Sequence, residues 1–370
     1  MTKTLLNISR FVWKTKSTTI AEISEELGID KSTVSRRINQ LKDIEYLHPD
    51  GEIAPGSTGG RKTTVFSLLK DRINVIGLDV HQDGIEGVIT NLAGEIEDSF
   101  SVHKQMTKNN IASLIAKTIR DKTTKYKLYG AGISLPGIIN SKNGVVVYSK
   151  ALDISQLHLK EKLSTSLEIP LIMENDSNIG VTYYNSKLWE SAKNILYFYI
   201  SVPYKLKDPV GVGVGISLLN RLYQGSNNHA GEYEFSLYLT DNEDSKKLDY
   251  FTFLEKYSEN DICKEARNFV KSISQKIAFL ISIFDPDTVV INGNIRFMPD
   301  SILNTMIKKI KNNVFMADKR KIQFIRERKE NALNAIGASL NFLLELFNKD
   351  EQLTNFLNCL KKEAHKNDKG

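Results

Sequence analysis

The sequence predicts an α/β protein with two similar lobes that follow a small, mostly helical N-terminal domain. Up to about residue 70, apolar residues recur at helical spacing, which is typical of amphipathic helices. From Asn74 onward, short apolar strands alternate with helices in two similar rounds, which begin at Val75 and Ile195. We therefore expect an N-terminal domain over 1–70, lobes over 71–188 and 189–330, and C-terminal helices over 331–370 that pack back on the lobes.

Composition limits the classes of protein that the chain can represent. The formal net charge is +6 and the isoelectric point about 8.9, which permits nucleic-acid binding without proving it. Two cysteines, Cys263 and Cys359, exclude a disulfide framework and a multi-cysteine zinc site within one chain. The N-terminus lacks the apolar run of a signal peptide, and no stretch is long and apolar enough for a membrane span. We expect a soluble, cytoplasmic protein with no membrane partner.

Three helices are predicted in the N-terminal domain. The first places its apolar residues at Leu5, Ile8 and Val12. Thr19 and Glu22 form a capping-box pattern that begins the second helix, and Gly28 supplies the left-handed residue that ends it. Asp30 is the predicted N-cap of a third helix over 31–41.

The third helix has the pattern of a DNA-recognition helix. Val34, Ile38 and Leu41 share one face and are predicted to pack inward. The outward residues can contact base edges and phosphates in a major groove. They are Lys31, Ser32, Thr33, Ser35, Arg36, Arg37 and Gln40.

Two extended segments around Leu47 and over 64–68 enclose the glycine-rich, basic run 56–62. We interpret this as the wing of a winged helix-turn-helix, with Arg61 and Lys62 able to probe a minor groove. The alternative is a three-helix bundle with a solvated basic face, since charged faces are usually only solvated. The tight turn at Gly28, the helix spacing and the basic face occurring together favour DNA binding.

Five motifs along the chain resemble those of the ROK family of repressors, open reading frames and kinases, in its regulator branch with the xylose and N-acetylglucosamine repressors. They are 56–62 at the wing, Leu135–Asn140, Glu174–Asn178, Ala230–Glu232, and Phe284–Asp287 with Ile291–Gly293. The resemblance implies a duplicated actin-like (ribonuclease H-like) fold with a ligand site between the lobes. It also implies Asn175, Asp176 and Glu232 as contacts to a sugar.

The chain departs from the family's kinases where they bind ATP phosphates. Those kinases have an Asp-x-Gly-Gly-Thr loop, whose glycines let the backbone wrap phosphates. Here Asp79 is followed by Val80-His81-Gln82-Asp83, without the glycines or the hydroxyl. The segment 211–215, Gly-Val-Gly-Val-Gly, alternates like a strand, and we favour a glycine-rich strand over a phosphate loop. We expect no catalytic residue, no cofactor and no enzyme activity.

The zinc and sugar motifs are also altered. Phe235 stands where relatives place a zinc-bound histidine, and no cysteine cluster follows, so we expect no metal site. His229 precedes the motif and is isolated. Asp176 matches the family's catalytic base, but it fits equally well as an N-cap of the following helix.

These patterns leave three hypotheses. The leading one is a repressor that binds a palindromic double-stranded DNA operator as a homodimer, or a dimer of dimers, and senses a sugar or sugar derivative. The second is a sugar kinase with an added DNA-binding domain. The third is a regulator whose two-lobe domain serves only as a dimerisation scaffold.

Overall fold

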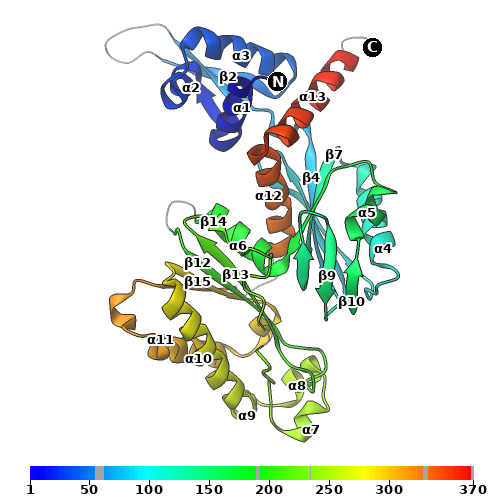
Figure 1. Cartoon of the computed structure of the whole chain (residues 1–370), viewed down its shortest axis with the longest axis vertical. Coiled ribbons are helices and arrows are strands. Elements are labelled where there is room, and N and C mark those ends of the chain that lie inside the picture. The colour runs from blue at the N-terminus through cyan, green and yellow to red at the C-terminus, as the bar shows by residue number, and fades with distance from the viewer. Residues whose placement is uncertain (55–61, 189–191, 234, 328–331, 368–370) are drawn as a thin grey trace.

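The computed structural model describes residues 1–54, 62–188, 192–233, 235–327 and 332–367. It shows an elongated molecule with the N-terminal domain at one end, the first lobe in the middle and the second lobe at the other end (Figure 1). We call these parts the head, lobe 1 and lobe 2. Within the described residues, no helix combines the length and apolarity needed to span a membrane.

The head is a winged helix-turn-helix, as predicted. Its helices are α1 (Lys3–Thr15), α2 (Ile20–Leu27) and α3 (Lys31–Asp43), and its strands are β1 (Ser17–Thr19), β2 (Leu47–Ile53) and β3 (Thr63–Leu68), in the order β1-β3-β2. Thr19 and Glu22 form the reciprocal capping box, and Gly28 ends α2 at φ 63°. Asp30 caps α3 by accepting a hydrogen bond from the Thr33 amide. The predicted caps are therefore confirmed; β1 was not predicted.

Lobe 1 is a five-stranded mixed sheet of order β11-β7-β4-β5-β6. Its strands are β4 (Asn74–His81), β5 (Gly84–Asn91), β6 (Ile96–His103), β7 (Leu128–Leu135) and β11 (Leu171–Asn175). The short helix η1 (Lys70–Arg72) precedes it. A small sheet of β8 (Ile138–Asn140), β9 (Val145–Ser149) and β10 (Ile154–Leu157) adjoins it, with helices α4 (Ile111–Thr123) and α5 (Leu159–Ser164).

Lobe 2 repeats this topology as β14-β13-β12-β15-β16. Its strands are β12 (Ile195–Ser201), β13 (Gly211–Leu218), β14 (Arg221–Leu222), β15 (Thr288–Asn292) and β16 (Gln323–Arg326). Its helices are α7 (Glu243–Lys246), α8 (Tyr250–Lys256), α9 (Glu259–Glu265), α10 (Arg267–Phe284), η2 (Asn294–Phe297), α11 (Asp300–Asn313) and η3 (Ala317–Lys319). In both lobes an antiparallel three-stranded meander is extended by two parallel strands, which confirms the predicted duplication.

One predicted helix differs from the structure. The spacing of apolar residues predicts a single helix over 261–284, whereas in the structure α9 ends at Glu265 and α10 begins at Arg267. Ala266 between them has ψ 5°, outside the helical range near −42°, so the axis breaks there.

Two helices connect the lobes at the waist of the molecule (Figure 1). Helix α6 (Asp176–Lys187) follows the last strand of the lobe 1 sheet but packs on β12 and β13 of lobe 2. Helix α12 (Leu333–Asn348) follows the last strand of lobe 2 but packs on β4, β5 and β7 of lobe 1. The final helix, α13 (Asp350–Asn367), continues from α12 to the head, where it packs against α1.

Candidate DNA interface and interlobe site

Helix α3 presents the predicted polar face to solvent. Val34, Ile38 and Leu41 are buried in the core of the head. Lys31, Ser32, Arg36 and Gln40 are exposed, and Thr33, Ser35 and Arg37 are half-buried. The face therefore has the chemistry of a groove-binding surface, with cationic and amide side chains on one side of a helix.

Local hydrogen bonds decide which of these groups remain available. Asp30 accepts from the Thr33 amide at 2.9 Å and from the Ser32 hydroxyl at 2.5 Å, and these bonds hold the pKa of its carboxyl below the usual range. Ser32 and the Thr33 amide are thus engaged within the helix cap. Arg37 donates to Gln40 at 2.8 Å, whereas Arg36 makes only a 3.5 Å contact with Thr33. Of the two guanidinium groups on this face, that of Arg36 has the weaker hydrogen bond within the protein and is the more available for DNA.

The wing strands β2 and β3 pair antiparallel, with an irregularity between Pro49 and Glu52. Lys62 lies directly before β3, is exposed, and forms an ion pair with Glu52 at 3.1 Å. The predicted wing-tip residue Arg61, with the rest of 55–61, lies outside the described residues. Lys62 therefore marks the described part of the wing that could approach a phosphate backbone.

A row of polar side chains crosses the end of the lobe 1 sheet. Asp79 on β4 pairs in register with Ser134 on β7, which pairs in register with Glu174 on β11. Adjacent residues of paired strands point to the same side, so the three side chains lie next to one another at the carboxyl ends of parallel strands. This edge is where ligands bind in open α/β sheets.

Asn175 is held by bonds within the protein. Its carbonyl oxygen accepts from the amides of Ser177 at 2.8 Å and Asn178 at 3.2 Å, which makes Asn175 the N-cap of α6. Its amide nitrogen donates to the Gly137 carbonyl at 2.8 Å and to the Glu232 carboxylate at 3.3 Å. The suggestion that Asp176 caps this helix was wrong by one residue. The extended backbone of Asn175, at ψ 144°, is the conformation that a cap requires.

Asp176 occupies the first position of α6 and is buried. Burial, together with the negative charges of Asp79 and Glu232, raises its pKa to about 7, although bonds from Ser177 partly offset this. Burial likewise raises the pKa of Asp79 to about 6. The structure therefore places the buried carboxyl group of Asp176 close to that of Asp79, which is partly exposed, and such carboxyl pairs are common at functional sites.

Glu232 reaches this site from lobe 2. Gly213 on β13 forms an isolated bridge with Glu232, which fixes the backbone beside the start of α6. The Glu232 side chain is exposed along part of its length, but burial of its carboxyl group and the nearby Glu174 raise its pKa, which His229 partly offsets. The three predicted ligand contacts are thus brought together, with Asn175 hydrogen-bonded to Glu232.

Glu174 lies in the Glu174–Asn178 motif but was not predicted as a ligand contact, and its carboxylate accepts several hydrogen bonds. It accepts from Ser141 at 2.8 Å, from Asn178 at 3.0 Å and from Gln224 of lobe 2 at 2.7 Å. Gln224 is distant in the sequence and belongs to no motif, so the sequence carried no signal for this contact. The bond from Gln224 joins the two lobes at this site.

Two cavities among the described residues lie away from the three predicted contacts. A cavity of about 430 Å³ lies in lobe 2 among Tyr204, Lys205, Lys207, Lys246, Lys247 and Asp249. Another of about 290 Å³ lies between β6 and α4. Neither includes the three predicted contacts, and Asn175 and Asp176 are 6% and 9% exposed.

Of the two segments compared with phosphate loops, 211–215 is a strand, and 79–83 is the end of β4 followed by a turn. Strands β4 and β5 pair as far as His81 and Gly84, so only Gln82 and Asp83 form the turn. Segment 211–215 lies in β13, paired with β12, as favoured from the sequence. A side chain at Gly213 would meet the Ser177 hydroxyl at 2.0 Å. The glycine therefore allows α6 to pack closely on β13.

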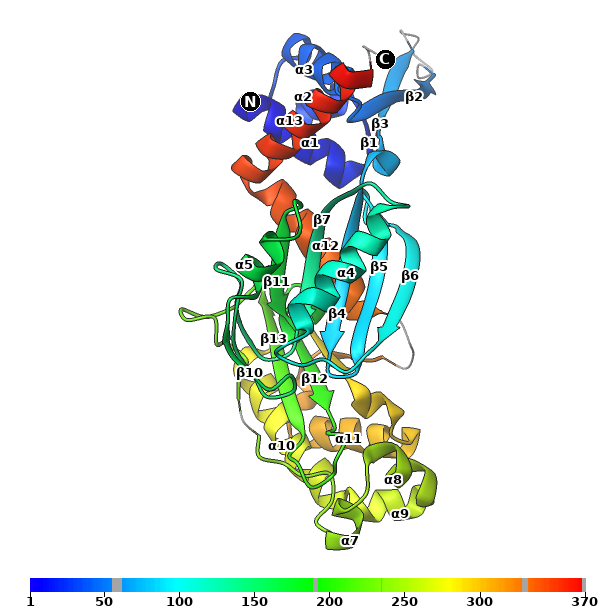
Figure 2. The same cartoon turned by 90° about the vertical axis from the view of Figure 1, so that its right-hand side faces the viewer.

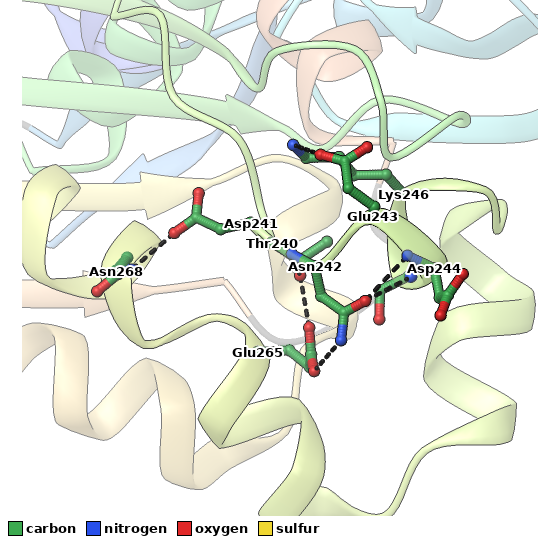
Figure 3. Close-up of polar contacts among 9 residues, drawn as sticks. Thr240, Asp241, Asn242, Glu243, Asp244, Lys246, Glu265 and Asn268 are labelled. Carbon is green, nitrogen blue, oxygen red and sulfur yellow. Dashed lines mark hydrogen bonds and ion pairs between the residues drawn. The ribbon is translucent and has the colours of Figure 1, made fainter.

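The region that follows Ala230–Glu232 is held by side-chain hydrogen bonds. Phe235 is buried in the lobe 2 core, with its ring 5.0 Å from that of Tyr233. Beyond it, Glu265 accepts from Thr240 at 2.5 Å and from Asn242 at 3.2 Å, and Asp241 accepts from Asn268 at 2.6 Å (Figure 3). Across the described ranges, no three His, Cys, Asp or Glu side chains are grouped to hold a metal ion.

Comparisons with known proteins agree with this architecture. The model of the ROK family matches residues 75–235 and 236–343, and a winged helix-turn-helix DNA-binding model matches 1–47. The xylose repressor of Bacillus subtilis (strain 168) is 27% identical over 332 residues, which cover 80% of this chain and 83% of that protein.

Two solved structures share the fold at 16% identity. A ROK family transcriptional regulator, a homologue of the Escherichia coli MLC protein, has a TM-score of 0.69 and covers 96% of this chain and 98% of its own. A ROK family glucokinase from Streptomyces griseus, in complex with glucose and AMPPNP, has a TM-score of 0.59 and covers 72% and 98%. The regulator match includes the head, whereas the glucokinase match covers less of the chain.

Proposed function

The chain belongs to the ROK family and is a DNA-binding repressor, and we propose that it acts as a dimer on a palindromic operator under the control of a sugar. The observation that carries DNA recognition is the exposed face of α3, with Arg36 at its centre, beside a winged hairpin that carries Lys62. Such a helix enters the major groove, and two-fold symmetry of the protein requires two related half-sites.

Operator binding is tested by fluorescence anisotropy with duplexes from the protein's own promoter region. We expect a sequence-specific complex that Arg36→Ala weakens by a factor of at least ten, since a base contact contributes about 1–3 kcal/mol. Arg267→Ala is the matched control, because Arg267 is an exposed arginine of lobe 2. Equal affinity of the wild type for promoter and unrelated DNA would contradict the proposal.

The effector site that we propose comprises Asn175, Asp176 and Glu232. Carboxylates accept hydrogen bonds from sugar hydroxyls, and the three residues come from both lobes, so a bound sugar would bridge them. Relatives of the chain are xylose repressors, which makes xylose the first probe. A sugar that binds the folded state raises the melting temperature, and Glu232→Ala should remove that rise.

We propose no phosphotransfer for this chain. Gln82 and Asp83 form a two-residue turn, and their carbonyl oxygens accept from Met106 and Lys104. Positioning and charge neutralisation of phosphates dominate phosphoryl transfer, and an acidic turn supplies neither. ATP-dependent phosphorylation of a hexose that is lost in Asp176→Asn would refute this.

A scaffold function is the second candidate, because Asn175 is fully engaged in internal bonds and Asp176 is buried. A melting temperature that no sugar or sugar phosphate changes, combined with specific operator binding, would favour the scaffold over the sensor.

A further inference from the structure

The head is joined to lobe 1 by more than its connecting segment. The backbone enters lobe 1 through η1. There the Leu69 amide donates to the backbone carbonyl of Tyr46, and the Leu92 amide donates to that of Lys70. A single apolar cluster combines residues of the head, the start of lobe 1 and the C-terminal helices. Its members include Leu5, Ile8, Val12, Tyr46, Val75, Leu92, Phe347, Phe356 and Leu360. The head therefore shares a core with lobe 1 and is not a separately tethered module.

The contacts of Trp13 hold this junction. Its ring stacks on Phe347, at the end of α12, with centroids 4.3 Å apart and planes 10° apart. Its indole N–H donates to the Leu92 carbonyl of lobe 1 at 2.9 Å. Arg10, one turn before it, donates to the Phe347 carbonyl at 2.6 Å and forms an ion pair with Asp350. One face of α1 is thus fixed to lobe 1 and to the α12–α13 corner.

Helix α13 makes a second connection along its length. The Phe356 ring contacts Tyr46 of the head at 6.4 Å and Tyr129 of lobe 1 at 4.9 Å between centroids. Arg72 forms ion pairs with Glu45, which follows α3, at 2.7 Å and with Glu363 of α13 at 3.6 Å. Figure 2 shows α13 lying along the head from the end of α12 upward. The segment directly after the recognition helix is therefore held by α13, the helix that continues from α12.

The opposite end of α12 crosses α6 at the waist with little side-chain material between them. A Cβ atom at Gly337 would meet the Ile179 backbone oxygen and its Cγ2 atom at 2.8 Å. Helix α6 carries Asn175 and Asp176 at its start and packs on lobe 2. The crossing at Gly337 is where a change in the angle between the lobes must be absorbed, since the two helices connect them.

We propose that the head, lobe 1 and α12–α13 move as one body, so that the angle at the α6–α12 crossing sets the direction of the recognition helix relative to lobe 2. This rests on the proposed function, because it states how the interlobe site would control DNA binding. Trp13 and Phe356 are positioning residues: they touch neither DNA nor the interlobe acids, yet coupling between the two sites depends on them. Coupling between two sites typically changes affinity 5- to 150-fold. We expect a change in the angle at the α6–α12 crossing to alter affinity for DNA within about this range.

The first test needs no DNA. Hydrogen–deuterium exchange of the full chain is compared for wild type, Trp13→Ala, Trp13→Phe and Tyr204→Ala. Trp13→Ala should speed exchange across α1–α3 at least tenfold, and Trp13→Phe should restore protection because it keeps a stacked ring. Tyr204→Ala, which truncates an exposed aromatic residue of lobe 2, should leave the head unchanged. Unchanged exchange in Trp13→Ala would overturn the proposal.

The second test is a double-mutant cycle on promoter affinity. Gly337→Ala forces α12 away from α6 and should change promoter affinity at least fivefold, although the residue is remote from the DNA face. In the Trp13→Ala background the same substitution should change affinity less than twofold. An effect of equal size in both backgrounds, or no effect in either, would overturn the proposal. Should Gly337→Ala fail to fold, Ile179→Val alters the same crossing.

The outcomes separate the two claims. Absence of specific promoter binding by the wild type would contradict the proposed function, and the exchange experiment would still decide whether the head and lobe 1 form one body. Specific binding together with a failed cycle would leave the repressor function standing and remove the coupling.

Discussion

Replacing Asp176 with Asn should stabilise the folded protein above neutral pH. Asp176 is buried next to Asp79 and Glu232, and its pKa rises from the ordinary 3.8 to about 7. A rise of this size corresponds to roughly 4 kcal/mol that folding must supply to keep the carboxylate buried. Asn keeps an oxygen that accepts from the Ser177 amide, as Asp176 does at 2.7 Å. Part of this cost comes from the negative charge of Asp79, which can itself take up a proton. We therefore expect Asp176→Asn to raise the free energy of unfolding by about 2–4 kcal/mol.

The sign follows from the two protonation states. Between the ordinary pKa of 3.8 and the folded value of about 7, the folded chain holds a proton that the unfolded chain has lost. Stability of the wild type therefore falls as pH rises through this window. The gain from Asp176→Asn should be near zero at about pH 4 and complete above about pH 7.

Urea unfolding followed by circular dichroism, at about pH 5 and about pH 8, measures the difference. Asp208→Asn is the matched control, because Asp208 is exposed in lobe 2 and should show no pH-dependent gain. A loss of stability in Asp176→Asn at the higher pH, or a gain independent of pH, would refute the account of the site. A confirmed gain would mean that the chain retains a destabilising acid, which is the signature of a residue kept for binding.

Three further predictions concern other parts of the molecule. Lys62→Gln should weaken promoter and unrelated DNA alike and lower the slope of log affinity against log salt by about 0.9, the value for one phosphate contact; an unchanged slope would place Lys62 off the backbone. Phe235→Ala should destabilise the protein by roughly 3–5 kcal/mol in urea unfolding, since it removes a buried ring from the lobe 2 core; a loss below about 1 kcal/mol would contradict core packing. Asp30→Ala should lower the melting temperature at neutral pH and have less effect at acidic pH, because bonds from Ser32 and Thr33 depress the pKa of Asp30 and their benefit is lost once it protonates; an equal effect at both pH values would refute this.

Local signals allowed much of the fold to be predicted. The Thr19 and Asp30 caps, the Gly28 turn and the first strand of each lobe depend on residues within a few positions of one another, and the structure has them where expected. The position of α13 could not be predicted in the same way. Its apolar stripe indicates a helix with one buried face, but a stripe does not specify whether Tyr46 of the head or Tyr129 of lobe 1 covers it. It contacts both.

The face of α3 and the interlobe site also differ in how far the sequence predicts them. The face of α3 follows from helical periodicity alone, so its exposed residues were predictable. At the interlobe site, the motif located Asn175 and Asp176, but their roles depend on partners elsewhere in the chain. Gln224 binds Glu174 from the other lobe, and Gly137 fixes the Asn175 amide. No spacing rule encodes such contacts, because topology alone brings these residues together.

The glycines of 211–215 show that a glycine-rich segment cannot be assigned to a phosphate loop or a strand without knowing its neighbours in the fold. In a phosphate loop, glycine exposes backbone amides to the ligand. On β13, Gly213 pairs with Tyr199 on one side and with Glu232 on the other, so its backbone is engaged in the sheet. The space above it is filled by the Ser177 hydroxyl, which would lie 2.0 Å from any added Cβ. In a loop, the missing side chain of a glycine leaves room for a phosphate. At Gly213 it leaves room for the first turn of α6, which brings Asp176 close to Glu232.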